Sequence, residues 1–356
     1  MSVEAVVPAA VRDLLPDRID PAVVLRRRQI FRLAFGMTLS AALAFGIAWP
    51  LSFITPVLTA SLLTGPRALP LKAQIGVMVL LWISLTASSE LLLPLLDFAA
   101  VHILITGLLV FLLFYAKAMG TNPLVVVLLL LGVVAVPLIG TINPGLARAA
   151  SQGIFSAALV SAVVVRLAIV VFPDPATLAA PPAPPAPPKP SPSEGARTAL
   201  KSVVVMLPLI VAVQMLSIVS ATVGLVQAML LTLEPTYGRH LKMGAGLLVA
   251  HGAGGMVAVV IYQLLIMVPS FWFFLMICTA AALLMGDQIF SGTKLGSALK
   301  GGIATFFVVL GPSLTGDAAA GADLVVRLLT IAFAVVYVVL AFGLMERLTR
   351  GRRRAA

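Results

Sequence analysis

The chain has 356 residues, of which 61% are hydrophobic and 10% are charged, and its mean hydropathy is +1.12. These values lie outside the range of soluble globular proteins and indicate an integral membrane protein. A formal net charge of +11 would suggest nucleic-acid binding in a soluble protein. Here the basic residues stand in short segments between apolar runs, where they set topology and meet anionic lipid, so we expect no nucleic-acid partner. The single cysteine, Cys278, can form no internal disulfide.

The first apolar run lies between Arg32 and Arg67 and contains no charged residue. A bilayer core about 30 Å thick takes roughly 20 helical residues per crossing, so the run predicts two compact spans with a turn at Trp49-Pro50. Acidic residues precede the run and no small-residue cleavage motif follows it, so we expect a retained helix rather than a signal peptide. The uncharged stretch from Lys201 to Glu234 repeats the pattern.

The apolar segments together predict an all-α integral membrane protein with about twelve transmembrane helices in two sets of six. The first set is expected near residues 30–48, 51–65, 73–92, 98–116, 123–140 and 150–171. The second is expected near residues 199–216, 218–233, 243–267, 270–286, 297–313 and 324–345. We therefore divide the chain into an N-terminal segment (1–25), a first membrane unit (26–171), a linker (172–197), a second membrane unit (198–346) and a basic tail (347–356).

The linker is rich in Pro, Ala and Ser, a composition that favours extended polyproline II structure and cannot bury a core. A ligand for a proline-binding domain is the alternative reading of this segment. Of the 24 Lys and Arg residues, alternating spans place all but Arg148 and Arg327 on the side of both termini and the linker. The positive-inside bias therefore predicts cytoplasmic termini, a cytoplasmic linker and an even number of spans.

The two units resemble each other in sequence. LKAQIG (71–76) matches LKMGAG (241–246), and Pro94 and Pro269 stand near the midpoints of segments of equal length. The charged residues that match at similar offsets along the chain are Arg32 with Lys201, Arg67 with Arg239, Lys72 with Lys242, Lys117 with Asp287, and Arg148 with Arg327. Units in the same orientation predict parallel repeats about an axis along the membrane normal. The alternative is that any membrane protein repeats hydrophobic runs.

Chemistry-bearing motifs are sparse. The chain has no GxxxxGK[ST] phosphate loop, no HExxH and no CxxC, so we expect no ATP hydrolysis, no metal, no cofactor and no enzyme activity. Polar groups inside the membrane are costly and become candidates by default. His251, midway along the span 243–267, is a candidate proton relay; the alternative is a histidine bonded to a backbone carbonyl beside a close glycine contact. His102 with Asp97 is a second candidate pair, unless both are solvated at the outer boundary.

Six basic residues are candidate anion contacts. Arg148 and Arg327 break the positive-inside pattern, which suggests either an anion-contacting role or pairing with outer acids such as Glu90 or Asp323, or with lipid phosphate. The remaining four lie in the matched loops after the second span of each set and would focus anions at the cytoplasmic side: Arg67, Lys72, Arg239 and Lys242.

Two segments carry a family resemblance. RLAFGMTLSAALAFGIAWPLSFITPVLTASLL (32–63) resembles the opening of the fusaric acid resistance superfamily, and GGMVAVVIYQLLIMVPSFWF (254–273) resembles a second-half signature of its compact branch, a domain family without assigned function. The resemblance implies a bacterial inner-membrane efflux protein for aromatic and related organic acids. It also implies a periplasmic membrane-fusion adaptor and an outer-membrane channel as partners. The sizeable cytoplasmic domain of the classical exporters is replaced here by the proline-rich linker.

The function we expect is proton-coupled export of amphipathic organic anions by secondary transport. A passive organic-anion channel would need no titratable relay and stays open as an alternative. A major-facilitator-like transporter shares the six-plus-six plan, but the loop TGPRALPLK (64–72) lacks the acidic-basic pattern of that family. A membrane-embedded enzyme or lipid-handling scaffold is a further class, disfavoured by the absence of clustered polar motifs.

Overall fold

The computed structural model describes residues 21–49, 51–65, 70–174, 190–218, 221–233, 237–315 and 320–355, and all regular structure in these ranges is helical. The first set of helices comprises α2 (Pro21–Ile47), α3 (Ile54–Leu63), α4 (Leu71–Ala87), α5 (Ala99–Ala118), α6 (Pro123–Gly140) and α7 (Pro144–Val171). The second comprises α8 (Pro192–Met215), α9 (Thr222–Thr232), α10 (Tyr237–Met267), α11 (Phe271–Ile289), α12 (Lys294–Thr315) and α13 (Ala320–Ala355).

Eight helices in the described ranges are long and apolar enough to cross a membrane: α2, α4 with its short extension, α5, α7, α8, α10, α11 and α13. Their surfaces carry large apolar side chains that are mostly exposed, such as Leu104, Val170 and Trp272, each 74–75% accessible. Water would disfavour such faces and lipid would not. The prediction of an all-helical fold is therefore confirmed, and the eight candidate spans support a multi-pass membrane protein.

The two compact spans expected at 51–65 and 218–233 are shorter than predicted. Helices α3 and α9 contain 10 and 11 residues, or roughly 15 Å each, which is about half of a hydrocarbon core. The chain turns sharply before both, with positive φ angles at Ala48 (55°), Leu51 (59°) and Ser217 (51°). The prediction of twelve full crossings is therefore not confirmed, although each expected segment is helical.

Three helix boundaries differ from the sequence-based division. Helix α8 begins at Pro192, inside the expected linker 172–197, because Ser191 and Glu194 form a capping box around a proline at the first helical position. Helix α13 runs on to Ala355, so the backbone of the basic tail 347–356 continues the last helix. Helix α4 passes into a π turn (Ser88–Leu92) and a 3-10 turn (Pro94–Asp97), since Pro94 cannot continue an α-helix.

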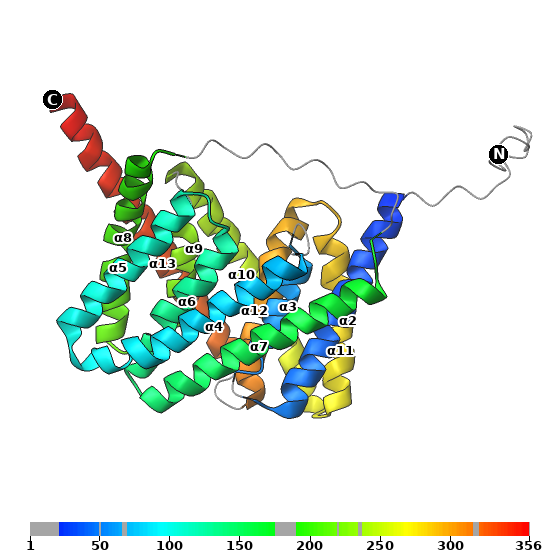
Figure 1. Ribbon diagram of the computed structural model, residues 1–356. Coiled ribbons are helices and arrows are strands. Elements are labelled where there is room, and N and C mark those ends of the chain that lie inside the picture. Colours follow the sequence, from blue (N-terminus) through cyan, green and yellow to red (C-terminus); the bar gives the residue numbers. More distant parts are fainter. Residues whose placement is uncertain are drawn as a thin grey trace, which may run out of the picture.

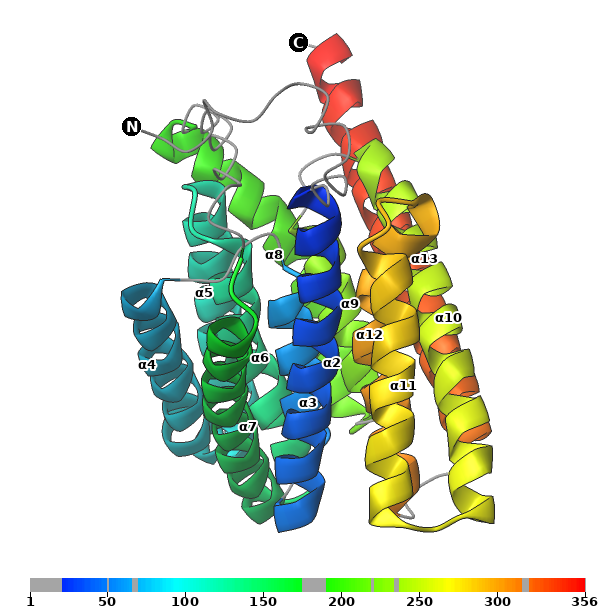
Figure 2. The same ribbon diagram turned by 90° about the vertical axis from the view of Figure 1, so that its right-hand side faces the viewer.

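The helices stand side by side in one bundle (Figures 1 and 2). Helix α2 begins and α13 ends at the same end of the molecule, where α7 also ends and α8 begins; we refer to it as the terminal end and to the other as the opposite end. Within the first set, α4, α5 and α7 each pack on α6, and α3 packs on α7; within the second, α10, α11 and α13 each pack on α12, and α9 packs on α13. The sets join through α2 with α11, α5 with α8, and α3 with α12.

Two large apolar cores hold the sets together. In the first core, Leu33 and Met37 of α2 pack with Cys278 of α11 and with Phe306 and Phe307 of α12. The second core combines α5 and α6 of the first set with α8, α9 and α13 of the second. A smaller third core lies among α4, α6 and α7. Because each large core draws on both sets, neither set is an independent domain.

Candidate functional site

His251, on α10, is the titratable group that the sequence places midway along a span. Its side chain is 7% exposed, its Nδ1 lies 2.8 Å from the Leu247 carbonyl oxygen, and its Nε2 lies 3.1 Å from Gln227 Nε2 of α9. An imidazole that donates from Nδ1 to the carbonyl accepts at Nε2 from the Gln227 amide, which corresponds to the neutral ring. The bond to the Leu247 carbonyl is the one that the structural alternative for His251 predicts, and Gln227 adds a polar partner on a second helix.

Arg327 of α13 lies close enough to His251 for their charges to interact. Helices α10 and α13 come together at Gly255, where a Cβ would collide with Leu324. Helix α10 also meets α12 at Gly254, whose missing Cβ leaves room for the Gly302 backbone. The structure thus brings together two candidate residues, His251 and Arg327, that lie far apart in the sequence.

His102 forms a second buried polar pair, with Gln214 of α8. Its ring is 4% exposed, and its Nε2 lies 3.3 Å from Gln214 Oε1 of α8 and 3.4 Å from Thr106 Oγ1. The expected pairing of His102 with Asp97 is wrong, because Asp97 is exposed in the 3-10 turn while His102 faces the α5–α8 contact. This pair joins the two sets of helices.

Asp97 lies instead with Arg148, in a hollow of about 560 Å³ at the opposite end. The hollow is lined by the turns before α5 and between α6 and α7, including Pro94 and Thr141. Arg148 Nε also lies 3.8 Å from Glu90 Oε1, and both side chains are more than half exposed. Arg148 therefore has the acidic neighbour that the sequence offered as the alternative to an anion-binding role.

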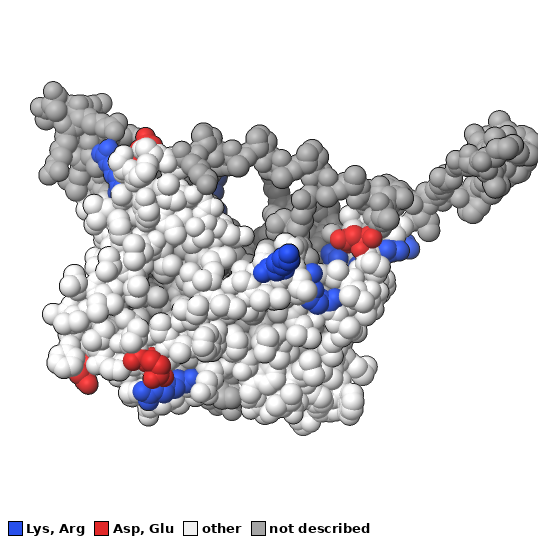
Figure 3. All heavy atoms as spheres, in the orientation of Figure 1, with Lys and Arg blue, Asp and Glu red and all other residues white. Residues whose placement is uncertain are grey.

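The remaining basic candidates lie toward the terminal end. Lys72 and Lys242 are exposed in the first turns of α4 and α10. Arg239 lies on α10 with its side chain outside the described part of the structure, and Arg67 lies outside the described residues. On the face shown in Figure 3, the few charged side chains lie in the upper half and at the lower left edge, and most of the surface is uncharged. This is the charge distribution of a protein that spans a bilayer.

Sequence reasoning missed one cavity, a groove of about 540 Å³ between α4 and α7. Its walls are apolar, and Gln74 and Arg166 form a hydrogen bond of 2.6 Å at one end. The signal was present, because Arg166 interrupts the expected span 150–171 and charged residues within spans are rare. The positive-inside pattern grouped Arg166 with the cytoplasmic basic residues, whereas it lies inside α7.

No candidate metal site is found in the part of the chain that the structure describes. No three His, Cys, Asp or Glu side chains there come together in a group that could hold a metal ion. Cys278, the one thiol, is buried between α2, α11 and α12.

The fold and these sites define a multi-pass helical membrane protein with buried polar pairs between its helices. Residues 29–168 match the model of a family described as "Protein of unknown function (DUF2955)", a membrane-protein family. The match covers the first set of helices and less than half of the chain. No curated protein and no solved structure matches the chain.

Proposed function

We propose that this protein is a proton-coupled secondary transporter that exports amphipathic organic acids across a bacterial inner membrane. The observation that carries the proposal is His251, an ionisable side chain buried in a candidate membrane span, next to Gln227 and within electrostatic range of Arg327. Ionisable groups at membrane depth are rare and mark proton relays and substrate paths. The resemblance of segments 32–63 and 254–273 to the fusaric acid resistance superfamily supports the substrate class and the direction of transport.

Protonation of His251 would change the contacts of three helices. The Gln227 amide donates to Nε2 of the neutral ring; after protonation the amide must rotate to offer its oxygen. The new charge would also stand near the cation of Arg327. Both changes act where α10 packs against α9 and α13, so proton binding can bias two arrangements of these helices.

The architecture that fits this function is a pair of parallel six-helix repeats. Ser161 of α7 donates to the Thr55 carbonyl of α3, and Thr330 of α13 meets Gly224 of α9. The step along the chain from Thr55 to Gly224 equals the step from Ser161 to Thr330. The contact between α3 and α7 therefore recurs, in the same register, between α9 and α13.

A second pair of contacts repeats in the same way. Ser84 meets Gly132 between α4 and α6, and Gly254 meets Gly302 between α10 and α12. The step from Ser84 to Gly254 equals the step from Gly132 to Gly302, and it is one residue longer than the step between α3 and α9. Equivalent helix contacts at a nearly constant offset support duplication.

This register changes one correspondence expected from the sequence. With the offset that relates Ser161 of α7 to Thr330 of α13, Arg327 corresponds to Ala158 and not to Arg148. The two arginines are therefore not equivalent in the proposal, and they lie in different parts of the molecule. Arg327 belongs with His251 inside the bundle, and Arg148 with Asp97 at the hollow of the opposite end.

Transport in inside-out vesicles tests the proposal. A labelled aromatic carboxylate should accumulate when an inward-acidic gradient is imposed, and collapse of the gradient should release it. His251→Ala should abolish the response to the pH gradient, whereas Gln263→Ala, an exposed position on the same helix, should not. Conduction that follows the anion gradient alone would favour a passive channel. No uptake of any aromatic acid by well-folded protein would contradict the proposed substrate class.

The proposed orientation places the terminal end in the cytoplasm, as the basic residues predict. Reporter fusions after Pro190 and after Ala356 should both report a cytoplasmic location. A periplasmic signal from either fusion would contradict the orientation. A periplasmic adaptor and an outer-membrane channel remain proposed partners, to be sought by crosslinking in intact cells.

A further inference from the structure

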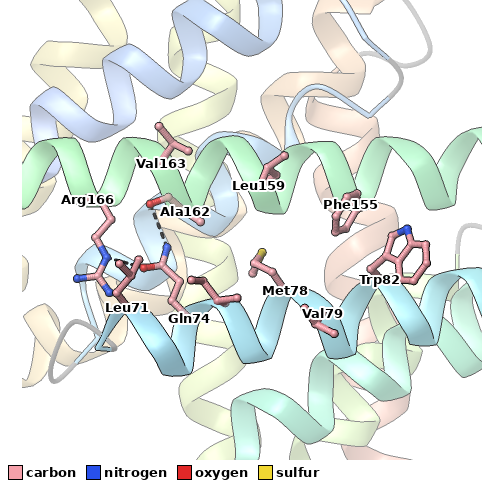
Figure 4. Close-up of a pocket in the computed structure, with 11 residues that line it drawn as sticks. Leu71, Gln74, Met78, Val79, Trp82, Phe155, Leu159, Ala162, Val163 and Arg166 are labelled. Carbon is pink, nitrogen blue, oxygen red and sulfur yellow. Dashed lines mark hydrogen bonds between the residues drawn. The ribbon is translucent and has the colours of Figure 1, made fainter.

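The groove between α4 and α7 is open on the outer face of the bundle (Figure 4). Ile75, Met78 and Val79 of α4 form one wall, and Phe155, Leu159 and Val163 of α7 form the other. Several of these side chains are about half exposed or more, so the groove opens to whatever surrounds the bundle. In a membrane protein, that surrounding is the acyl region of the bilayer.

One end of the groove is positively charged. Arg166 Nε donates to Gln74 Oε1 at 2.6 Å, and Gln74 Nε2 donates to the Ala162 carbonyl at 3.0 Å (Figure 4). This chain of hydrogen bonds orients the guanidinium between the two helices. The pair lies near the start of α4 and the end of α7, hence toward the terminal end of the molecule. Trp82 marks the apolar end (Figure 4).

The length of the groove matches one leaflet. Leu71 and Trp82 line its two ends. Between them α4 advances about three turns, which is about 16 Å along the helix. Half of a hydrocarbon core is roughly 15 Å. An amphiphile with an acyl chain along the walls would therefore bring its headgroup to the level of Arg166.

The second set of helices closes the corresponding space. Helices α10 and α13 meet at Gly244, where a Cβ would collide with Val335, and at Gly255, where it would collide with Leu324. At the offsets that relate α4 to α10 and α7 to α13, Gly244 and Val335 stand where the first set has Gln74 and Arg166. The first set thus has both the groove and Arg166, whereas the second set has no cation at the equivalent position.

We propose that the groove binds one anionic phospholipid of the leaflet at the terminal end, with its acyl chain between α4 and α7 and its phosphate at Arg166. Arginine suits this role because its planar guanidinium group can donate two parallel N–H hydrogen bonds to phosphate oxygens. The apolar walls and single cationic end complement a long amphiphile with one anionic head. This site does not depend on the transport function proposed above.

Fluorescence quenching of Trp82 in nanodiscs tests the proposal. The chain has three tryptophans, so Trp49→Phe with Trp272→Phe leaves Trp82 as the reporter. Phosphatidylglycerol brominated on its acyl chains should reach half-maximal quenching at a mole fraction roughly fivefold lower than brominated phosphatidylcholine, the effect of one basic group on an anionic lipid. A reporter with only Trp272, exposed on α11, should show no such preference.

Two variants separate the groove from general surface charge. Arg166→Gln should remove the preference for phosphatidylglycerol, whereas Lys72→Gln, exposed at the same end but not lining the groove, should keep it. Arg166→Lys should keep part of the preference, and its folding is checked by a monodisperse size-exclusion profile. Equal quenching by both lipids, or loss of preference in Lys72→Gln alone, would overturn the proposal. Weak quenching by either lipid in a dimeric protein would overturn it too, because a second copy would then cover the groove.

Discussion

The two sets of helices make corresponding contacts but hold them with different chemistry. In the first set, hydroxyl groups bridge the helices: Ser84 Oγ donates to the Leu129 carbonyl of α6 at 3.0 Å, and Ser161 Oγ donates to the Thr55 carbonyl of α3 at 2.8 Å. In the second set, glycines bring the backbones together at Gly254 and Gly224. Hydrogen bonds and small residues are the two means of joining helices in lipid, where apolar surface alone gives little attraction.

The difference extends to where each set keeps its polar groups. At the same offsets, His251 and Gln227 of the second set correspond to Leu81 and Leu58, two residues of the apolar core between α4, α6 and α7. Conversely, the first set has Gln74 with Arg166 on its outer face where the second has Gly244 with Val335. At these matched positions the second set therefore has a polar pair inside the bundle, and the first set has one on its outer face.

The largest effect is expected where backbones touch. In Gly254→Ala the new methyl group would collide with the Gly302 backbone, which cannot move aside as a side chain would. Overpacking typically costs about 1–3 kcal/mol, and the upper end is expected against backbone, so we expect a lower yield of folded protein and an apparent Tm lower by roughly 5 °C. Gly252→Ala is the matched control, because its Cβ would meet nothing within 4 Å. Equal thermal stability of the two variants in detergent would show that α10 and α12 are not in backbone contact.

Much of the fold could be predicted from the sequence because hydrophobicity and length decide membrane insertion one segment at a time. The segments that became α5, α6 and α11 needed no tertiary information. Predictions failed where structure depends on neighbours. The turn expected at Trp49-Pro50 is flanked by the positive φ angles of Ala48 and Leu51, whereas the short lengths of α3 and α9 had no signal in the sequence.

The site was less predictable, since its geometry is set by contacts between segments distant in the chain. His251 was identified by its place midway along a span, but its partner Gln227 comes from α9, whose packing against α10 the sequence does not reveal. His102 was assigned to Asp97 because they are close in sequence, whereas the fold brings Gln214 to it from 112 residues away. Proximity along the chain was a poor guide to pairing in this bundle.

An intermediate effect is expected from converting the polar pair of the second set into the apolar pair of the first. His251→Leu alone leaves the Gln227 amide buried without its partner, which costs about 1–3 kcal/mol. Adding Gln227→Leu should recover most of this stability, because apolar groups then replace both partners. Transport should be lost in both variants if His251 couples protons. Recovery of the pH response in the double variant would assign the histidine a purely structural role.

The smallest effect on stability is expected at the opposite end, where Arg148 and Glu90 form an exposed ion pair with 3.8 Å between Nε and Oε1. Glu90→Gln should change the free energy of unfolding by less than about 0.5 kcal/mol, since water screens such pairs. Transport should nevertheless respond if Arg148 makes the anion contact that is one of the two alternatives from the sequence. Glu90→Gln removes a competing carboxylate and should raise transport at low ionic strength, whereas Arg148→Gln should reduce it. Both differences should fade as added salt shortens the range of the charges. Identical transport by the two variants at low salt would leave Arg148 as a partner of Glu90 alone, and anion recognition would then rest with Arg327 inside the bundle.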